Sequence, residues 1–255
     1  MNINLKATLL GGQAFNWEYN NDKYYGFTHS GLIILDNWGN IQQINENLDM
    51  DKYLGKDIDW VKIKKEINKD KYIDQAINKI KHITILKQNF YITTTSYILA
   101  TNKNIPAIRK SIKTLSSMFG NSIAGTNYKT FPSIRSLAQA STQDLQKASI
   151  GYRAQYLKET AKLLSEIQLP NNKEDVRKLL ISLPGIGPKV ADCILLYALR
   201  YLDTVPIDRW MFNIAKNIYN VKFTKNSDIS KWYSDYFGPY AGVAGQYLFE
   251  YYRSF

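Results

Sequence analysis

The spacing of apolar residues changes once along this chain, near residue 59, and this change limits the folds that the chain can adopt. Before it, β-rich segments are separated by turn residues such as Asn20-Asn21-Asp22, which predicts an antiparallel sheet over residues 1–50. After it, apolar residues recur at three- and four-residue steps, which is typical of helices. The pattern predicts an α+β fold, with an N-terminal antiparallel β-sheet domain followed by a larger all-helical region.

We expect the sheet domain to occupy residues 1–85 and the helical region residues 86–255. Periodicity and helix-start signals predict helices at residues 91–101, 105–119, 133–139, 142–148, 152–167, 173–182, 188–201, 209–219, 227–237 and 239–252. The sequence shows no long repeat and no low-complexity linker.

The excess positive charge lies entirely in the helical region. The sequence has 33 Lys and Arg against 22 Asp and Glu, a formal net charge of +11. Residues 1–85 hold 11 basic and 11 acidic residues, whereas residues 86–255 hold 22 basic and 11 acidic residues. A basic region of this kind indicates a polyanion partner, most often nucleic acid; an unspecialised basic surface is the alternative.

Few residues could support metal or redox chemistry. Cys193 is the single cysteine, which excludes a disulfide framework and a cysteine-held zinc or iron–sulfur cluster, and His29 and His82 are the two histidines. We therefore expect no metal-binding residues. The apolar stretches are too short to cross a bilayer, and the N-terminus lacks the features of a targeting signal. We expect no membrane partner and a cytoplasmic location, associated with the nucleoid if the source is prokaryotic.

The most informative motif is LPGIGPK at residues 183–189, which joins two predicted helices. Proline suits the first position of a helix, where its missing N–H costs nothing. Gly185 and Gly187 allow a tight hairpin whose amides face outward at a helix N-terminus, a geometry that binds phosphate. The motif is neither a Walker loop nor a dinucleotide fingerprint. An ordinary helix–turn–helix corner is the alternative.

Three side chains near this hairpin could carry chemistry. Lys189 falls in the first turn of the second helix, where the dipole favours the neutral amine that Schiff-base chemistry needs. Cys193 lies one turn further along the same face. Asp208 precedes the next predicted helix, where a carboxylate could stabilise positive charge on a sugar. The plain alternatives are a surface charge, a small buried side chain and a helix cap, respectively.

These residues resemble the helix-hairpin-helix DNA glycosylases with the Gly/Pro…Asp signature, the HhH-GPD superfamily. The string LPGIGPKVADCILLYAL, followed by VPID and a helix, carries the resemblance. The cysteine four residues after the lysine is similar to the 8-oxoguanine DNA glycosylase/AP lyase branch. Ordered matches to that branch extend over nearly the whole chain: GGQAFNW at 11–17, ATNKNI at 100–105, IGYRAQYL at 150–157 and FGPYAGVAGQYLF at 237–249.

The resemblance implies an enzyme of base excision repair that flips 8-oxoguanine out of duplex DNA, excises it and cleaves the strand by β-elimination. Lys189 would attack the anomeric carbon and form the Schiff base, and Asp208 would support the cationic transition state. The hairpin at Gly185 and Gly187 would hold a DNA phosphate. No cofactor would be required, although hairpin carbonyls could hold a monovalent cation. The helical region would form two all-α subdomains with a helix-hairpin-helix motif, which flank a DNA cleft. The partner would be double-stranded DNA containing a damaged base, bound by a monomer.

The resemblance also assigns the contacts to the opposite strand and the base. The positions that fill the gap and contact the widowed cytosine are Asn102, Tyr152 and Arg153. The Gly12 carbonyl would accept from the N7–H that distinguishes 8-oxoguanine from guanine, and Cys193 and Phe249 would sandwich the base. Taken alone, these residues could equally be loop, turn and core residues.

Three positions depart from the family pattern. The usual Gln of the last helix is Gly245 here, and Gln246 follows about 100° further around the helix. Gln246 either replaces the missing contact through a shifted helix, or recognition of the base edge is weaker. Ala107 stands where the animal enzymes have a second cytosine-reading Arg, and Trp210 where they have a His. These departures indicate a bacterial- or archaeal-like member with a relaxed preference for the opposite base.

Three alternatives stay open. A glycosylase for another damaged purine would share most motifs, although Lys189 argues against the purely water-using members. A non-catalytic DNA-binding module would use the hairpin for backbone contacts alone, which the presence of both Lys189 and Asp208 disfavours. A structural protein with a basic surface would not need the ordered motifs.

Overall fold

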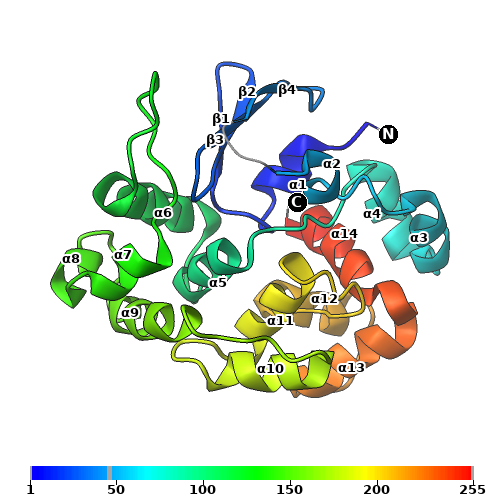
Figure 1. The fold of residues 1–255 in the computed structure, drawn as a ribbon. Helices are drawn as coiled ribbons and strands as arrows, with labels where there is room; N and C mark the ends of the chain where they lie inside the picture. The colour runs from blue at the N-terminus through cyan, green and yellow to red at the C-terminus, as the bar shows by residue number, and fades with distance from the viewer. Residues whose placement is uncertain (1, 45–47, 254–255) are drawn as a thin grey trace.

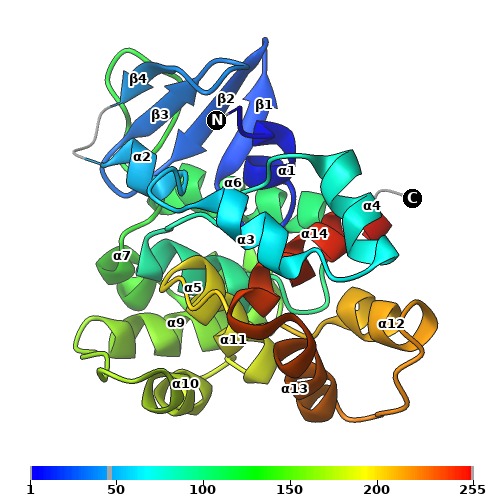
Figure 2. The same ribbon diagram turned by 90° about the vertical axis from the view of Figure 1, so that its right-hand side faces the viewer.

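The computed structural model describes residues 2–44 and 48–253, and Figures 1 and 2 show a small sheet beside a larger group of helices. The strands are β1 (Trp17–Asn20), β2 (Lys23–Phe27), β3 (Leu32–Leu35) and β4 (Ile41–Ile44). The helices are α1 (Leu5–Leu10), α2 (Met50–Tyr53), α3 (Trp60–Ile67), α4 (Lys71–Ile80), α5 (Phe90–Leu99), α6 (Ile105–Phe119), α7 (Ile134–Gln139), α8 (Thr142–Gln146), α9 (Arg153–Leu164), α10 (Lys173–Ser182), α11 (Pro188–Tyr197), α12 (Arg209–Asn217), α13 (Asn226–Phe237), the 3-10 helix η1 (Gly238–Tyr240) and α14 (Ala241–Arg253). The predicted α+β fold is confirmed.

The sheet is an antiparallel meander whose strands follow the order of the chain. β1 and β2 are joined through Asn21 and Asp22, whose φ angles of 45° and 57° are both left-handed. Asn and Asp enter this region more readily than other residues with side chains, and such a turn matches the twist of the strands. All four strands fall on the β-rich segments that the sequence predicts.

The prediction of β structure throughout residues 1–50 is wrong at α1. The Asn4 side chain caps this helix by accepting a hydrogen bond from the Ala7 N–H at 3.1 Å. The segment LKATLL consists mostly of good helix formers, and Leu5 and Leu9 are buried in the core of the sheet domain. Six residues are too few for helical periodicity to show in the sequence.

The core of the helical region begins earlier than the boundary expected at residue 85. α3 and α4 pack against α14, as Figure 2 shows for α3, and Trp60 and Ile73 belong to the same buried cluster as the later helices. A separate cluster that includes Trp17 and Leu54 fills the sheet domain. The larger cluster therefore already includes residues of α3 and α4, although Ala7 and Phe15 also belong to it and Leu86 belongs to the smaller one. The sequence shows the apolar faces of α3 and α4 but not their partner.

The predicted helices beyond residue 90 all occur, with bounds that differ by a few residues. The segment after α6 returns to the sheet, where the Phe131 N–H donates to the Thr28 carbonyl at 2.7 Å and Tyr128 stacks on Tyr25. These contacts fix the sheet against the helices. Within the described residues, no helix is both long and apolar enough to cross a membrane.

Candidate active site

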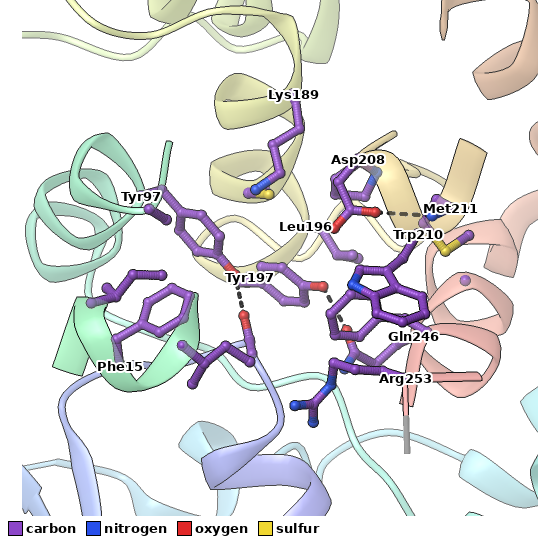
Figure 3. Close-up of a pocket in the computed structure, with 18 of the residues that line it drawn as sticks. Phe15, Tyr97, Lys189, Leu196, Tyr197, Asp208, Trp210, Met211, Gln246 and Arg253 are labelled. Atoms are coloured by element: carbon purple, nitrogen blue, oxygen red, sulfur yellow. Dashed lines mark hydrogen bonds between the residues drawn. The ribbon is translucent and has the colours of Figure 1, made fainter. Parts of the chain in front are cut away.

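A cavity of about 350 Å³ lies where α5, α11, α12 and α14 meet the loop that follows α1. Its size is within the range of small-molecule sites. The residues predicted for catalysis and for the base pocket all line it: Gly12, Lys189, Cys193, Asp208, Gln246 and Phe249. Figure 3 shows Lys189 and Asp208 entering this space from two different helices. The fold thus brings together six residues that the chain separates widely.

The hairpin beside this cavity joins α10 to α11, and its two glycines serve different purposes. Gly185 has a left-handed φ of 77°, and a Cβ there would lie 2.7 Å from the Cβ of Tyr156. Gly187 is the N-cap of α11 and makes no side-chain cap, and a Cβ there would meet no atom within 4 Å. The N–H groups of the first turn of α11 therefore have no side-chain cap and lie beside open space, where a phosphate can bind.

Gly185→Ala is expected to destabilise the protein by about 1–3 kcal/mol, because the added methyl group meets Tyr156 and the backbone is left-handed. This corresponds to a fall in Tm of about 2–4 °C per kcal/mol, measured by thermal unfolding. Gly187→Ala is the matched control, and its Tm should stay close to that of the wild type. Equal losses of stability in the two variants would contradict this account of the hairpin.

Lys189 occupies the second position of α11 and is half-buried. Its Nζ lies 5.3 Å from the centroid of the Tyr97 ring. Tyr97 is itself fixed, because its hydroxyl donates to the Gly12 carbonyl at 2.8 Å and its ring stacks on Tyr197 at 5.7 Å. The lysine thus extends along an aromatic wall toward the cavity, and its place on the helix agrees with the prediction.

Asp208 caps α12, which was the plain alternative to a chemical role, and it also lines the cavity. Its Oδ1 accepts from the Met211 N–H at 2.9 Å, which fixes the carboxylate at the start of the helix. In Figure 3 the carboxylate lies on the side of the cavity across from Tyr97. The helix cap and a carboxylate that lines the cavity are therefore the same group.

Cys193 is buried one turn along α11 from Lys189. Burial raises the pKa of the Cys193 thiol to about 12, with the Lys189 ammonium opposing this effect. The thiol is therefore neutral at physiological pH, and it is not an activated nucleophile. It contributes a small, polarisable surface to the cavity wall, which suits contact with a flat base.

Gly12 and Phe249 lie close together in the lining of the pocket. Gly12 has a φ of 128°, and a Cβ there would lie 3.3 Å from Cε1 of Phe249. The Gly12 carbonyl accepts one hydrogen bond from Tyr97, and a carbonyl oxygen has a second lone pair for a ligand donor. The Arg253 guanidinium lies over the Phe249 ring at 5.4 Å. The assignments of Gly12 as a reader of N7–H and of Phe249 as a stacking partner stay predictions.

Gln246 and Gly245 both line the cavity. The Gln246 amide is fixed between two residues: its Oε1 accepts from the Tyr197 hydroxyl at 2.6 Å, and its Nε2 donates to Glu250 at 3.3 Å. A Cβ at Gly245 would lie 3.3 Å from the end of the Met211 side chain. A side chain at position 245 would therefore start in close contact with Met211 and Val205, and the Gln246 amide lies beside this position with one hydrogen bond at each end.

Sequence reasoning missed Tyr97, Tyr197 and Glu250. Two of them follow predicted site residues at helical spacing: Tyr197 comes four residues after Cys193, and Glu250 four residues after Gln246. That spacing places each on the same helix face as the predicted residue. An acid inside the apolar run AGVAGQYLFEYY was the available signal for Glu250.

The residues predicted to contact the opposite strand lie outside the cavity and form a connected row. Asn102 is exposed at the turn between α5 and α6, with a left-handed φ of 51°. Arg153 is buried, and its guanidinium donates to the carbonyls of Thr101 and Ile150 and packs on the Tyr152 ring. Tyr152 is 55% exposed. Arg153 thus fixes the turn that carries Asn102, and direct contact of these residues with DNA stays a prediction.

A monovalent cation at the hairpin also stays a prediction. The Leu183 and Pro184 carbonyls accept from the Ile186 N–H at 3.1 Å and from the Thr160 hydroxyl at 2.7 Å, and each keeps one lone pair. Among residues 2–44 and 48–253, no cluster of three or more His, Cys, Asp or Glu side chains could hold a metal ion.

Comparison with known proteins agrees with this geometry. The family model described as HhH-GPD superfamily base excision DNA repair protein matches residues 95–233, more than half of the chain. The chain belongs to the HhH-GPD superfamily. The matched residues include the hairpin, Lys189 and Asp208, which the geometry places at the cavity. An N-glycosylase/DNA lyase of Saccharomyces cerevisiae is 35% identical over 175 residues, which cover 60% of this chain and 46% of that protein.

Solved HhH-GPD structures match over almost the whole chain. A structure of MBOgg1 in complex with a low-affinity DNA ligand has a TM-score of 0.91 and 32% identity, covering 99% of this chain and 93% of that one. The 8-oxoguanine glycosylase/lyase of Clostridium acetobutylicum, in complex with double-stranded DNA containing cytosine opposite 8-oxoguanine, has a TM-score of 0.90 and 29% identity, covering 99% and 92%. The chain spans about half the length of the curated relatives it matches.

Proposed function

We propose that this protein is a bifunctional DNA glycosylase/AP lyase of base excision repair that removes 8-oxoguanine from duplex DNA. One observation carries the proposal: a lysine amine and a carboxylate enter one cavity from the starts of two helices, beside a hairpin suited to a phosphate. The relatives named N-glycosylase/DNA lyase and the 8-oxoguanine glycosylase structures support it.

The arrangement accounts for both chemical steps. A base inside a duplex is unreachable, so the damaged nucleotide must be flipped out at a cost of about a few kcal/mol. The Lys189 amine attacks the anomeric carbon as the glycosidic bond breaks, and the base leaves with the bonding electrons and takes up the proton that the attacking nitrogen loses. Asp208 stabilises the positive charge on the sugar. The bond between the anomeric carbon and the ring oxygen then breaks, the ring oxygen gains a proton, and a Schiff base forms between Nζ and the anomeric carbon; loss of a proton from the adjacent carbon expels the 3′ phosphate.

The pocket supports an oxidised guanine as the substrate. The Gly12 carbonyl can accept a hydrogen bond from N7–H of 8-oxoguanine, whereas guanine has an acceptor at N7 and would meet it lone pair to lone pair. Cys193 and Phe249 offer two apolar surfaces for the base. We propose a monomer as the working unit.

Excision assays on matched duplexes test this proposal. We expect base release and strand cleavage on a duplex with 8-oxoguanine opposite cytosine, and neither with guanine at that position. Borohydride should trap a covalent protein–DNA adduct during the reaction. Release of a different damaged purine with no release of 8-oxoguanine would assign the alternative substrate class. Tight binding with no trapped adduct and no base release would instead support a binding module and refute the enzyme.

A further inference from the structure

A buried acid at the base pocket has no part in the reaction described above. Glu250 is 3% exposed and lies on α14, one turn beyond Gln246. Its carboxylate accepts hydrogen bonds from the Gln246 amide at 3.3 Å and from the Arg253 guanidinium at 2.8 Å. It also lies against Gly11, where a Cβ would come within 2.2 Å of its Oε1. Burying a carboxylate is costly unless it is paired, and this one reaches the GGQ segment because Gly11 has no side chain.

The hydrogen bonds of the Gln246 amide leave part of its capacity for a ligand. Tyr197 uses one of the two lone pairs on Oε1, and Glu250 uses one of the two N–H groups on Nε2. One acceptor and one donor remain on a side chain that lines the cavity. An ionised carboxylate can only accept, so it selects Nε2 as its neighbour and leaves Oε1 for the tyrosine hydroxyl. The order of donor and acceptor is thereby fixed.

We propose that Glu250 is a positioning residue that holds the Gln246 amide in one orientation and so sets which purine edge the pocket accepts. The inference rests on the proposed function, because it assumes that a flipped purine enters this cavity. The predicted role of Gln246 is contact with the base edge. The inference adds that Glu250 decides which end of the amide faces which atom of the base. Without Glu250, the amide could turn over and present its donor and acceptor in the opposite order.

Two lesions differ in the feature that this orientation reads. 8-Oxoguanine presents an acceptor at O6 beside a donor at N1–H, whereas 8-oxoadenine presents a donor at N6–H beside an acceptor at N1. Both lesions carry the oxidised C8 and the N7–H, so the Gly12 carbonyl can accept the same hydrogen bond from either. A fixed amide pairs with one order of donor and acceptor on the base and leaves buried polar groups unpaired with the opposite order. Unpaired buried polar groups are a strong basis for discrimination between the two lesions.

The charges around Glu250 make this orientation depend on pH. Arg253 faces it from α14, Arg109 from α6 and Tyr197 from α11, while α1 contributes backbone at Gly11. Burial raises the pKa of Glu250 to about 7, with the two arginines opposing this effect. Above this pH the carboxylate accepts from Nε2. Below it the protonated carboxyl can donate to Oε1 instead, so the hold on the amide weakens as pH falls.

The test compares excision of 8-oxoguanine and 8-oxoadenine, each opposite cytosine, under single-turnover conditions at about pH 6 and about pH 8. For the wild type, we expect the ratio of the two rates to fall at least about tenfold between the higher and the lower pH. Glu250→Gln should have a ratio at least about tenfold below that of the wild type at the higher pH, with no further change on acidification. Glu66→Gln removes an exposed carboxylate on α3 and should match the wild type at both pH values.

A ratio and a pH profile in Glu250→Gln equal to those of the wild type would overturn the inference. If that variant does not unfold cooperatively, Tyr197→Phe decides the question, because it removes the other hydrogen bond that orders the amide and should lower the ratio at both pH values. An unchanged ratio in Tyr197→Phe would then refute the inference. Absence of any 8-oxoguanine release by the wild type is a different result, since it refutes the proposed function itself.

Discussion

Lys189→Gln is expected to remove base excision and strand cleavage together and to leave no borohydride-trapped adduct. The amide cannot attack the anomeric carbon, and the Lys189 amine enters the cavity that Asp208 also lines. Loss of a covalent nucleophile leaves what binding and electrostatics supply, so we expect the excision rate to fall by at least about 10⁴-fold. Single-turnover assays on an 8-oxoguanine duplex measure this loss.

Two controls separate chemistry from folding and binding in this experiment. Lys62→Gln removes an exposed lysine on α3 and should react and trap like the wild type. Duplex binding by Lys189→Gln should remain, because the hairpin and the start of α11 do not depend on this side chain. A trapped adduct in the Lys189→Gln variant would place the nucleophile elsewhere and contradict our assignment.

Asp208→Asn is expected to lower the excision rate by about 10²–10³-fold while leaving the stability almost unchanged. In the proposed reaction the carboxylate supplies the negative charge that faces the sugar, and asparagine cannot supply it. Asparagine is as good a helix cap as aspartate, so the hydrogen bond from the Met211 N–H should persist. Single-turnover excision and thermal unfolding of the same preparation measure the two effects.

Asp208→Ala provides the comparison for this carboxylate. It should lose the activity and, in addition, about 1 kcal/mol of stability, because the cap is removed with the charge. A preformed abasic site should still give a trapped adduct with Asp208→Asn, since Lys189 is intact and the base has already left. Full excision activity in Asp208→Asn would show that the residue serves only as a cap.

Those features of the site that depend on neighbours in the sequence could be predicted from it. The hairpin, the place of Lys189 in the first turn of α11 and the capping position of Asp208 follow from the local residues, and the structure agrees with each. The resemblance then connected these segments to Gly12 and Phe249, which periodicity alone could not have brought together.

The parts that escaped prediction depend on contacts between distant segments. Arg153 is held partly by the Thr101 carbonyl, which lies in the distant turn between α5 and α6. Glu250 gains its place because Gly11 leaves room for it, a relation that neither segment reveals by itself. The apolar faces of α3 and α4 likewise identify no partner, so their packing with the later helices could not be predicted.

The meeting of Gly12 with Phe249 has a consequence for biosynthesis. On the ribosome, the segment after α1 emerges long before α14, so the base pocket cannot close until nearly all of the described chain has been made. A nascent chain that already contains α10 and α11 holds the hairpin and Lys189 without the wall that α14 supplies. Contacts of such long sequence separation form late in folding. The Lys189 amine is therefore made before the cavity wall that α14 supplies, and the cavity is complete only when α14 docks.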